Sequence, residues 1–111
     1  CPLYLVRDRD VIQYAPDKIP IGGFELHGQS FTDHRIQLQE GDVVYIFSDG
    51  YADQFGGPKG KKFLYRRFRE LLVAISNEPL EAQKRALLEA FMDWKGAHEQ
   101  VDDILVIGMR A

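Results

Sequence analysis

Two carboxylate-bearing segments contain the residue types in this sequence that could do chemistry. Ser48-Asp49-Gly50 follows a run of β-branched and aromatic residues, and Asp102-Asp103 precedes another apolar run. If both runs are strands, their acidic ends can meet at one edge of a sheet. Carboxylate oxygens are the ligands that Mg²⁺ and Mn²⁺ prefer, and a bound cation would offset the repulsion between clustered carboxylates. The pair of segments therefore favours a site for a hard divalent cation.

Each acidic segment taken alone also fits an ordinary structural role. Asp-Gly after a strand is most often only a turn, and Asp-Asp before a strand is most often a solvated loop or a cap. Taken singly, each segment favours that structural role. The pair is more suggestive of a metal site, because such a site needs several oxygen ligands from separate places in the chain.

Hydrophobic periodicity predicts the strands that would position these segments. Residues 43–47 are apolar on both faces and predict a central strand, paired as a hairpin with a strand over 31–38. Strands are also predicted over 3–6 and 11–14, joined by a polar turn, and over 103–109 at the end of the chain.

A first helix is predicted over about 61–75, after a Gly- and Pro-rich loop at 54–60. Its apolar residues recur at helical spacing and form one stripe: Leu64, Phe68, Leu71, Leu72 and Ile75. The aromatic side chains of both helical regions are expected in the core rather than in a ligand cage: Phe63, Phe68, Phe91 and Trp94.

A second helix is predicted to follow directly and to run to about Trp94. Asn77 or Glu78 would cap it, Pro79 would occupy its first turn, and Gly96 would end it. Its apolar face would contain Leu80, Leu87, Leu88, Phe91 and Trp94. Strands, then two helices, then a returning strand predict an α+β fold in which the helix pair covers one face of an antiparallel sheet.

Composition limits the classes of function. The net charge of −3 argues against general nucleic-acid binding, which favours a basic surface. No apolar run is long enough to cross a membrane, so we expect no membrane contact by this segment. The single Cys1 allows no internal disulfide and no zinc motif, and a cytoplasmic location is the simplest expectation. His27, His34 and His98 have no partners at metal-binding spacing and are expected to be exposed.

Basic residues follow the Asp49 segment, and two interpretations of them remain open. Lys59, Lys61 and Lys62 could be part of a solvated surface with extended side chains. Alternatively, they could steer a phosphorylated, acidic protein toward the edge where Asp49 lies.

The acidic segments, in this order and with helices between them, resemble motifs of the SpoIIE-type (stage II sporulation protein E) serine phosphatases. These are a bacterial branch of the metal-dependent type 2C protein phosphatases. Residues 41–53 resemble the family's GD…TDG…E segment, with Asp53 where glutamate is usual. Residues 102–104 resemble its terminal DD-I-T motif, with Leu105 in place of threonine, and Leu64 stands where glycine is common.

This resemblance implies a fold, a metal site and a reaction. Residues 1–111 would form the C-terminal portion of a phosphatase domain, as part of an α-β-β-α sandwich whose N-terminal part is missing. Two Mn²⁺ or Mg²⁺ ions in the complete domain would be bound here by Asp49, Asp102, Asp103 and the backbone of Gly50, with Asp49 and Asp102 as the catalytic pair. The ions would activate water for direct attack on phosphoserine or phosphothreonine. Asp53 would brace the loop.

The resemblance also implies partners. The substrate would be a phosphorylated bacterial regulatory protein such as an anti-sigma-factor antagonist. Upstream sensory domains would precede the phosphatase domain, and missing N-terminal regions could anchor the parent protein to a membrane. We expect the isolated chain to be inactive, because two acidic segments cannot complete two metal sites. We also expect it to self-associate through the sheet face that the other half of the sandwich would cover.

Two other functions remain open. A non-catalytic pseudophosphatase, or protein-interaction module of the same fold, gains some support from Leu105 and Asp53, which depart from the family's pattern. Another two-metal phosphoesterase, such as a nuclease, is weakened by the acidic charge balance.

Overall fold

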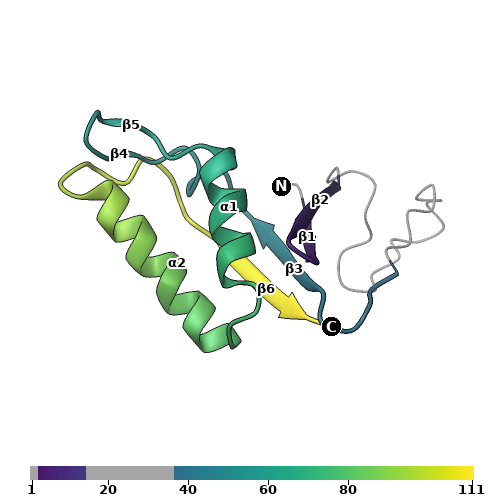
Figure 1. Ribbon diagram of the computed structural model, residues 1–111. Helices are drawn as coiled ribbons and strands as arrows, with labels where there is room; N and C mark the ends of the chain where they lie inside the picture. The colour runs from purple at the N-terminus through teal and green to yellow at the C-terminus, as the bar shows by residue number, and fades with distance from the viewer. Residues whose placement is uncertain (1–2, 15–36) are drawn as a thin grey trace.

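A computed structural model describes residues 3–14 and 37–111 of the chain. Two helices lie side by side next to a sheet, and a small two-stranded hairpin lies next to the helices on the side away from the sheet (Figure 1). The α+β prediction is confirmed. In chain order the elements are β1 (Leu3–Arg7), β2 (Asp10–Tyr14), β3 (Val43–Phe47), β4 (Phe55–Gly56), β5 (Lys61–Lys62), α1 (Tyr65–Ile75), α2 (Leu80–Lys95) and β6 (Val106–Arg110).

The main sheet has four antiparallel strands in the order β2-β1-β3-β6. β3 is central, as its apolar sequence predicts, and the predicted β1–β2 hairpin is also confirmed. The predicted pairing of β3 with residues 31–38 is wrong, because β1 and β6 occupy the two edges of β3. Residues 31–36 themselves lie outside the described part of the chain.

The two faces of the sheet have different environments. Side chains of β1 and β3 alternate, and one set packs with α1 and α2 in the main core: Tyr4, Val6, Val43, Tyr45 and Phe47. Leu3, Leu5 and Val44 form a second buried cluster. On β6, Ile107 and Met109 are 45% and 53% exposed and pair with Ile46 and Val44 of β3. They therefore lie on the sheet face opposite the helices, where they extend an apolar surface into solvent.

Helix α1 begins at Tyr65, later than the predicted residue 61. Lys61 and Lys62 instead pair with β4, and the Leu64 backbone is left-handed, with φ 78°. Tertiary pairing has therefore overridden the helical tendency of this segment. The apolar stripe is confirmed for Phe68, Leu72 and Ile75, which are buried, whereas Leu64 is 46% exposed.

Helix α2 begins after Pro79, which occupies the N-cap position and makes no side-chain cap hydrogen bond. The prediction that Asn77 or Glu78 caps this helix is therefore wrong. The predicted end is confirmed, because Gly96 has φ 51° and its N–H donates to the Met92 carbonyl at 3.0 Å. The predicted apolar face is only partly covered: Phe91 is buried, whereas Leu80 and Leu88 are 44% and 60% exposed.

Within the part of the chain that the structure describes, neither helix has the length and apolar character needed to cross a membrane.

Candidate active site

Hydrogen bonds join the two acidic segments at one end of β3. The backbone N–H of Ser48 donates to the Leu105 carbonyl at 2.9 Å. The Ser48 hydroxyl accepts a hydrogen bond from the Leu105 N–H at 2.9 Å and donates to the Asp103 carbonyl at 3.0 Å. The structure therefore places the segment that contains Asp49 beside the segment that contains Asp102 and Asp103.

The Ser48 hydroxyl also explains why β6 is shorter than predicted. The sequence predicts a strand from residue 103, but β6 begins at Val106. The Ser48 side chain bonds the Asp103 carbonyl and the Leu105 N–H, so these groups do not continue the regular β3–β6 ladder. Asp102 and Asp103 consequently lie in the loop before β6 rather than at the start of a strand.

Gly50 allows the two segments to approach closely. A Cβ at this position would lie 2.3 Å from the Asp103 carbonyl oxygen and 3.1 Å from Cγ1 of Ile104. Such a contact with backbone cannot be relieved by a rotamer change. The glycine of the Asp49-Gly50 pair is therefore required by the packing of the two acidic segments, whether or not its carbonyl reaches a metal.

The Asp49 carboxylate is exposed, and one of its oxygens is already bound within the protein. The Tyr65 hydroxyl, from the first residue of α1, donates to Oδ1 of Asp49. Burial and then this hydrogen bond raise the pKa of Tyr65 above its usual value, so the phenol stays neutral and remains a donor at physiological pH. Tyr65 could not be identified from the sequence, because only the fold brings α1 to the end of β3.

The Asp102 carboxylate has a local partner. Its Oδ1 accepts a hydrogen bond from the Asp103 N–H at 2.7 Å, and its backbone carbonyl accepts one from Gln100 Nε2 at 3.0 Å. Both aspartates are exposed. Asp102 thus makes the local side-chain to backbone hydrogen bond expected of a solvated loop or cap. Because both side chains are exposed, carboxylate oxygens also remain accessible to a ligand.

Gln54 connects the Asp49 loop to the chain that leads to Asp102. Its buried side chain donates from Nε2 to the carbonyls of Phe55, at 2.9 Å, and Glu99, at 2.8 Å. Its backbone carbonyl accepts hydrogen bonds from Trp94 Nε1 at 3.0 Å and from the Phe63 N–H at 2.9 Å. Gln54 could not be identified from the sequence either, because a polar residue in a glycine-rich loop gives no sign that it will be buried.

Asp53, which was predicted to brace the loop, precedes the β4–β5 hairpin, and the lysines predicted to steer substrate belong to that hairpin. The Asp53 N–H donates to the Asp49 carbonyl at 3.0 Å, and the Asp53 carboxylate lies 3.7 Å from Lys62 Nζ. Lys62 Nζ also lies 5.9 Å from the centre of the Phe55 ring. Lys59 and Lys61 are exposed, as is His98. The other two predicted histidines, His27 and His34, lie outside the described residues.

The residue types at this edge fit a hard divalent cation, because the accessible side-chain donors are carboxylates. Across residues 3–14 and 37–111, however, no cluster unites three or more His, Cys, Asp or Glu side chains in a geometry that could bind a metal. The three carboxylates at this edge, Asp49, Asp102 and Asp103, thus do not form a metal site by themselves, and octahedral coordination would need further oxygen ligands.

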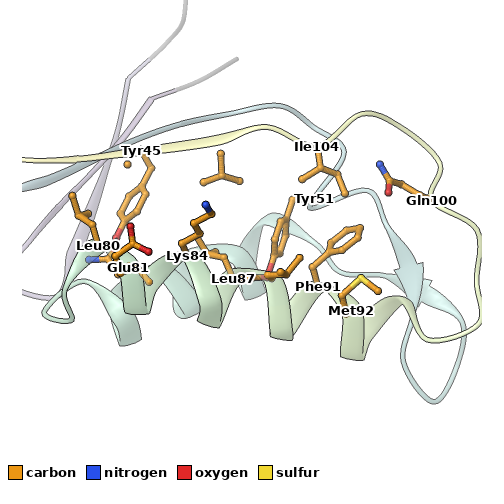
Figure 2. Close-up of a pocket in the computed structure, with 14 residues that line it drawn as sticks. Tyr45, Tyr51, Leu80, Glu81, Lys84, Leu87, Phe91, Met92, Gln100 and Ile104 are labelled. Carbon is orange, nitrogen blue, oxygen red and sulfur yellow. Dashed lines mark hydrogen bonds between the residues drawn. The ribbon is translucent and has the colours of Figure 1, made fainter.

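A cavity of about 620 Å³ lies apart from the carboxylates, between α2 and the strands (Figure 2). Tyr45, Tyr51, Leu87 and Phe91 line it, together with side chains from the loop before β6. Two tyrosines cross from the sheet side to α2: Tyr45 bonds Gln83 Oε1 at 2.5 Å, and Tyr51 bonds the Leu87 carbonyl at 2.6 Å. Asp49, Asp102 and Asp103 do not line this cavity, so it is not part of the candidate site.

Comparisons with known proteins identify the family and the fold of the chain. The family model for stage II sporulation protein E (SpoIIE) matches residues 1–111. Among solved structures, the SiaA-PP2C domain of Pseudomonas aeruginosa is similar, with a TM-score of 0.76 and 27% sequence identity. The match covers 99% of this chain and 42% of that chain, so this chain spans less than half of the SiaA-PP2C length. A search of curated proteins found no match. The chain belongs to the SpoIIE family.

Proposed function

We propose that this chain is part of a metal-dependent protein serine/threonine phosphatase domain. Membership of the SpoIIE family and similarity to a PP2C domain indicate a phosphatase domain in general. The observation that carries the finer proposal is the joining of the Asp49 and Asp102-Asp103 segments through Ser48. That contact brings accessible carboxylates from distant parts of the chain to one edge of the sheet.

In this proposal Asp49 and Asp102 hold Mn²⁺ or Mg²⁺, with Asp103 and the backbone of Gly50 as further candidates. Bound ions would supply a hydroxide nucleophile and stabilise charge on the phosphoryl oxygens. Gly50 lets the two ligand segments approach, and Ser48 fixes their separation. Further ligands would come from outside the described residues.

We propose a phosphorylated bacterial regulatory protein, such as an anti-sigma-factor antagonist, as the substrate, and upstream sensory domains as the source of control. Lys59 and Lys61 are exposed in the β4–β5 hairpin, which follows the Asp49 loop in the chain, and in this proposal they attract an acidic phosphoprotein. Lys62 is less available for this role, because it lies 3.7 Å from the Asp53 carboxylate.

The test uses the full-length protein and two conservative substitutions, Asp49→Asn and Asp102→Asn. Each keeps the side-chain shape and removes one negative charge, so each should weaken Mn²⁺ binding and lower turnover of a phosphoserine peptide by orders of magnitude. Asp93→Asn, an exposed aspartate on α2, is the matched control and should change neither quantity. Wild-type turnover in Asp49→Asn at limiting Mn²⁺ would refute the proposal.

A second candidate is a non-catalytic module of the same fold. It is favoured by the absence of a three-ligand cluster among the described residues and by the pairing of Asp53 with Lys62. The two candidates differ in one measurement. A phosphatase binds Mn²⁺ and hydrolyses a chromogenic phosphomonoester in a chelator-sensitive manner, whereas a non-catalytic module does not hydrolyse it.

A further inference from the structure

Tyr65 spans the distance between the start of α1 and the end of β3. Its hydroxyl donates to Oδ1 of Asp49, and its ring lies 6.2 Å from the ring of Phe47. Phe47 is the last residue of β3 and is only 1% exposed. The tyrosine ring therefore packs on the last residue of the strand that leads to Asp49, and the hydroxyl approaches the carboxylate from a fixed side.

The backbone around Tyr65 is also fixed relative to Asp49. The Leu64 N–H donates to the Ala52 carbonyl at 2.8 Å, and the Phe63 N–H donates to the Gln54 carbonyl at 2.9 Å. The same loop is closed by the hydrogen bond from the Asp53 N–H to the Asp49 carbonyl at 3.0 Å. These bonds hold the first residue of α1 beside the loop that follows Asp49, so no backbone segment has to become ordered for Tyr65 to bond the carboxylate.

The hydrogen bond occupies one Asp49 carboxylate oxygen and leaves the other available. Oδ1 accepts from Tyr65, whereas Oδ2 has no protein hydrogen-bond donor among the described residues. A carboxylate with one oxygen bound to a neutral donor can still give its other oxygen to a cation. Hydrogen bonds from outer residues to ligating groups orient those groups and tune metal affinity.

We propose that Tyr65 is a positioning residue that holds Asp49 for cation binding through Oδ2. This inference rests on the proposed function, because it assumes that Asp49 is a metal ligand. The alternative is that the Tyr65 hydroxyl competes with the cation for Asp49. In that case Tyr65 would have to release Asp49 before metal binding, and its presence would lower the affinity for the metal. The two roles predict opposite changes when the hydroxyl is removed.

The experiment titrates the metal-free full-length protein with Mn²⁺ by calorimetry. Tyr65→Phe should weaken Mn²⁺ binding by about 10- to 100-fold. Turnover at saturating Mn²⁺ should fall much less than turnover at limiting Mn²⁺. The matched control is Tyr51→Phe, which removes a tyrosine hydroxyl bonded to the Leu87 carbonyl inside the core. It should lower the unfolding midpoint and leave Mn²⁺ affinity unchanged.

A double-mutant cycle separates positioning from a purely structural effect. If Tyr65 acts through Asp49, then Tyr65→Phe should have almost no further effect on Mn²⁺ affinity in an Asp49→Asn background. Equal losses in both backgrounds, or an affinity in Tyr65→Phe equal to or above that of the wild type, would overturn the positioning role.

Two outcomes distinguish a failure of the proposed function from a failure of the positioning role. If Asp49→Asn binds Mn²⁺ as tightly as the wild type, Asp49 is not a ligand and both proposals fall. If Asp49→Asn abolishes binding while Tyr65→Phe behaves like the wild type, only the positioning role is overturned.

Discussion

At the scale of single residues, Asp42 is the most strongly bonded carboxylate in the described structure. It is 2% exposed and accepts hydrogen bonds from Arg7 Nε at 3.0 Å, from Arg7 NH2 at 2.6 Å and from the Gln39 N–H at 2.8 Å. Asp42 belongs to the Gly41-Asp42 pair, which resembles the GD of the family's motif. Its side chain ties the β1–β2 hairpin to the turn before β3, so its role here is structural.

The Arg7–Asp42 pair predicts a specific pH dependence of stability. The hydrogen bond from Arg7, and then the one from the Gln39 N–H, lower the pKa of Asp42 below its ordinary 3.8. A lowered folded-state pKa stabilises the protein above the unfolded pKa, and this stabilisation is lost as the pH falls through the folded pKa. Asp42→Asn should therefore destabilise the protein at pH 7, and its deficit relative to the wild type should shrink below about pH 4.

Denaturant unfolding of both proteins from pH 7 to pH 3 measures this effect. Asp93→Asn, which alters an exposed aspartate, should follow the wild-type curve throughout. A constant difference between the wild type and Asp42→Asn across this range would contradict the linkage to Asp42 ionisation.

Leu64 carries a second prediction at this scale, because its φ of 78° is unfavourable for a bulky residue. Its side chain is 46% exposed, so it contributes little burial in return. Leu64→Gly should remove the strain and raise the free energy of unfolding by about 1 kcal/mol. Leu64→Ala keeps the Cβ and should not stabilise the protein. Thermal unfolding that ranked the alanine variant above the glycine variant would count against stored strain.

At the scale of elements, long-range hydrogen bonds decide where helices and strands begin. Residues 61–62 were predicted as the start of a helix but pair with β4. Helix α1 starts only after Leu64, whose positive φ changes the direction of the backbone. Similarly, the Ser48 hydroxyl bonds groups that would otherwise continue β6 toward Asp103. Both boundaries adjoin the candidate site, so the same contacts that shift the elements also place Asp49 and Asp103.

Gln54 allows these element contacts to be tested. Gln54→Ala removes the donors to the Phe55 and Glu99 carbonyls, and it should lower the free energy of unfolding by about 2 kcal/mol because two hydrogen bonds from a buried side chain are lost. Amide hydrogen exchange should also accelerate at Phe63 and Gly57, whose N–H groups join this hairpin to its surroundings. Gln13→Ala, at an exposed position on β2, is the control. Unchanged exchange in Gln54→Ala would show that the hairpin is held by other contacts.

At the scale of the whole molecule, the sheet has one face covered by helices and another on which β6 remains exposed. Ile107 and Met109 lie on that second face and are 45% and 53% exposed. An exposed apolar strand at a sheet edge favours association with another chain. Self-association of the isolated chain is therefore still the expected behaviour.

Light scattering of the isolated 1–111 chain measures this prediction. Ile107→Lys should shift the chain toward monomer, because it places a charge on the exposed sheet face. Leu88→Lys alters a residue on α2 that is 60% exposed, and it should leave the association unchanged. A concentrated wild-type chain that stays monomeric would contradict the expectation.

The sequence alone determined the features that depend on neighbours along the chain. Alternation predicted the β1–β2 hairpin, an apolar run predicted β3 at the centre of the sheet, and helical spacing with Gly96 predicted α1, α2 and the end of α2. Sequence motifs also indicated the SpoIIE family, whose model matches residues 1–111. These features follow from periodicity and backbone preference, which act over a few residues.

Tertiary structure alone decided the features that depend on residues far apart in sequence. Both neighbours of β3, the later start of β6 and the bonds of Gln54 to Glu99 and of Tyr65 to Asp49 belong to this class. A hydroxyl or amide can satisfy many partners, and its residue type does not indicate which one the fold brings within reach. The acidic segments were visible in the sequence, but the residues that hold them together became identifiable only when the sheet and α1 placed them at the same edge.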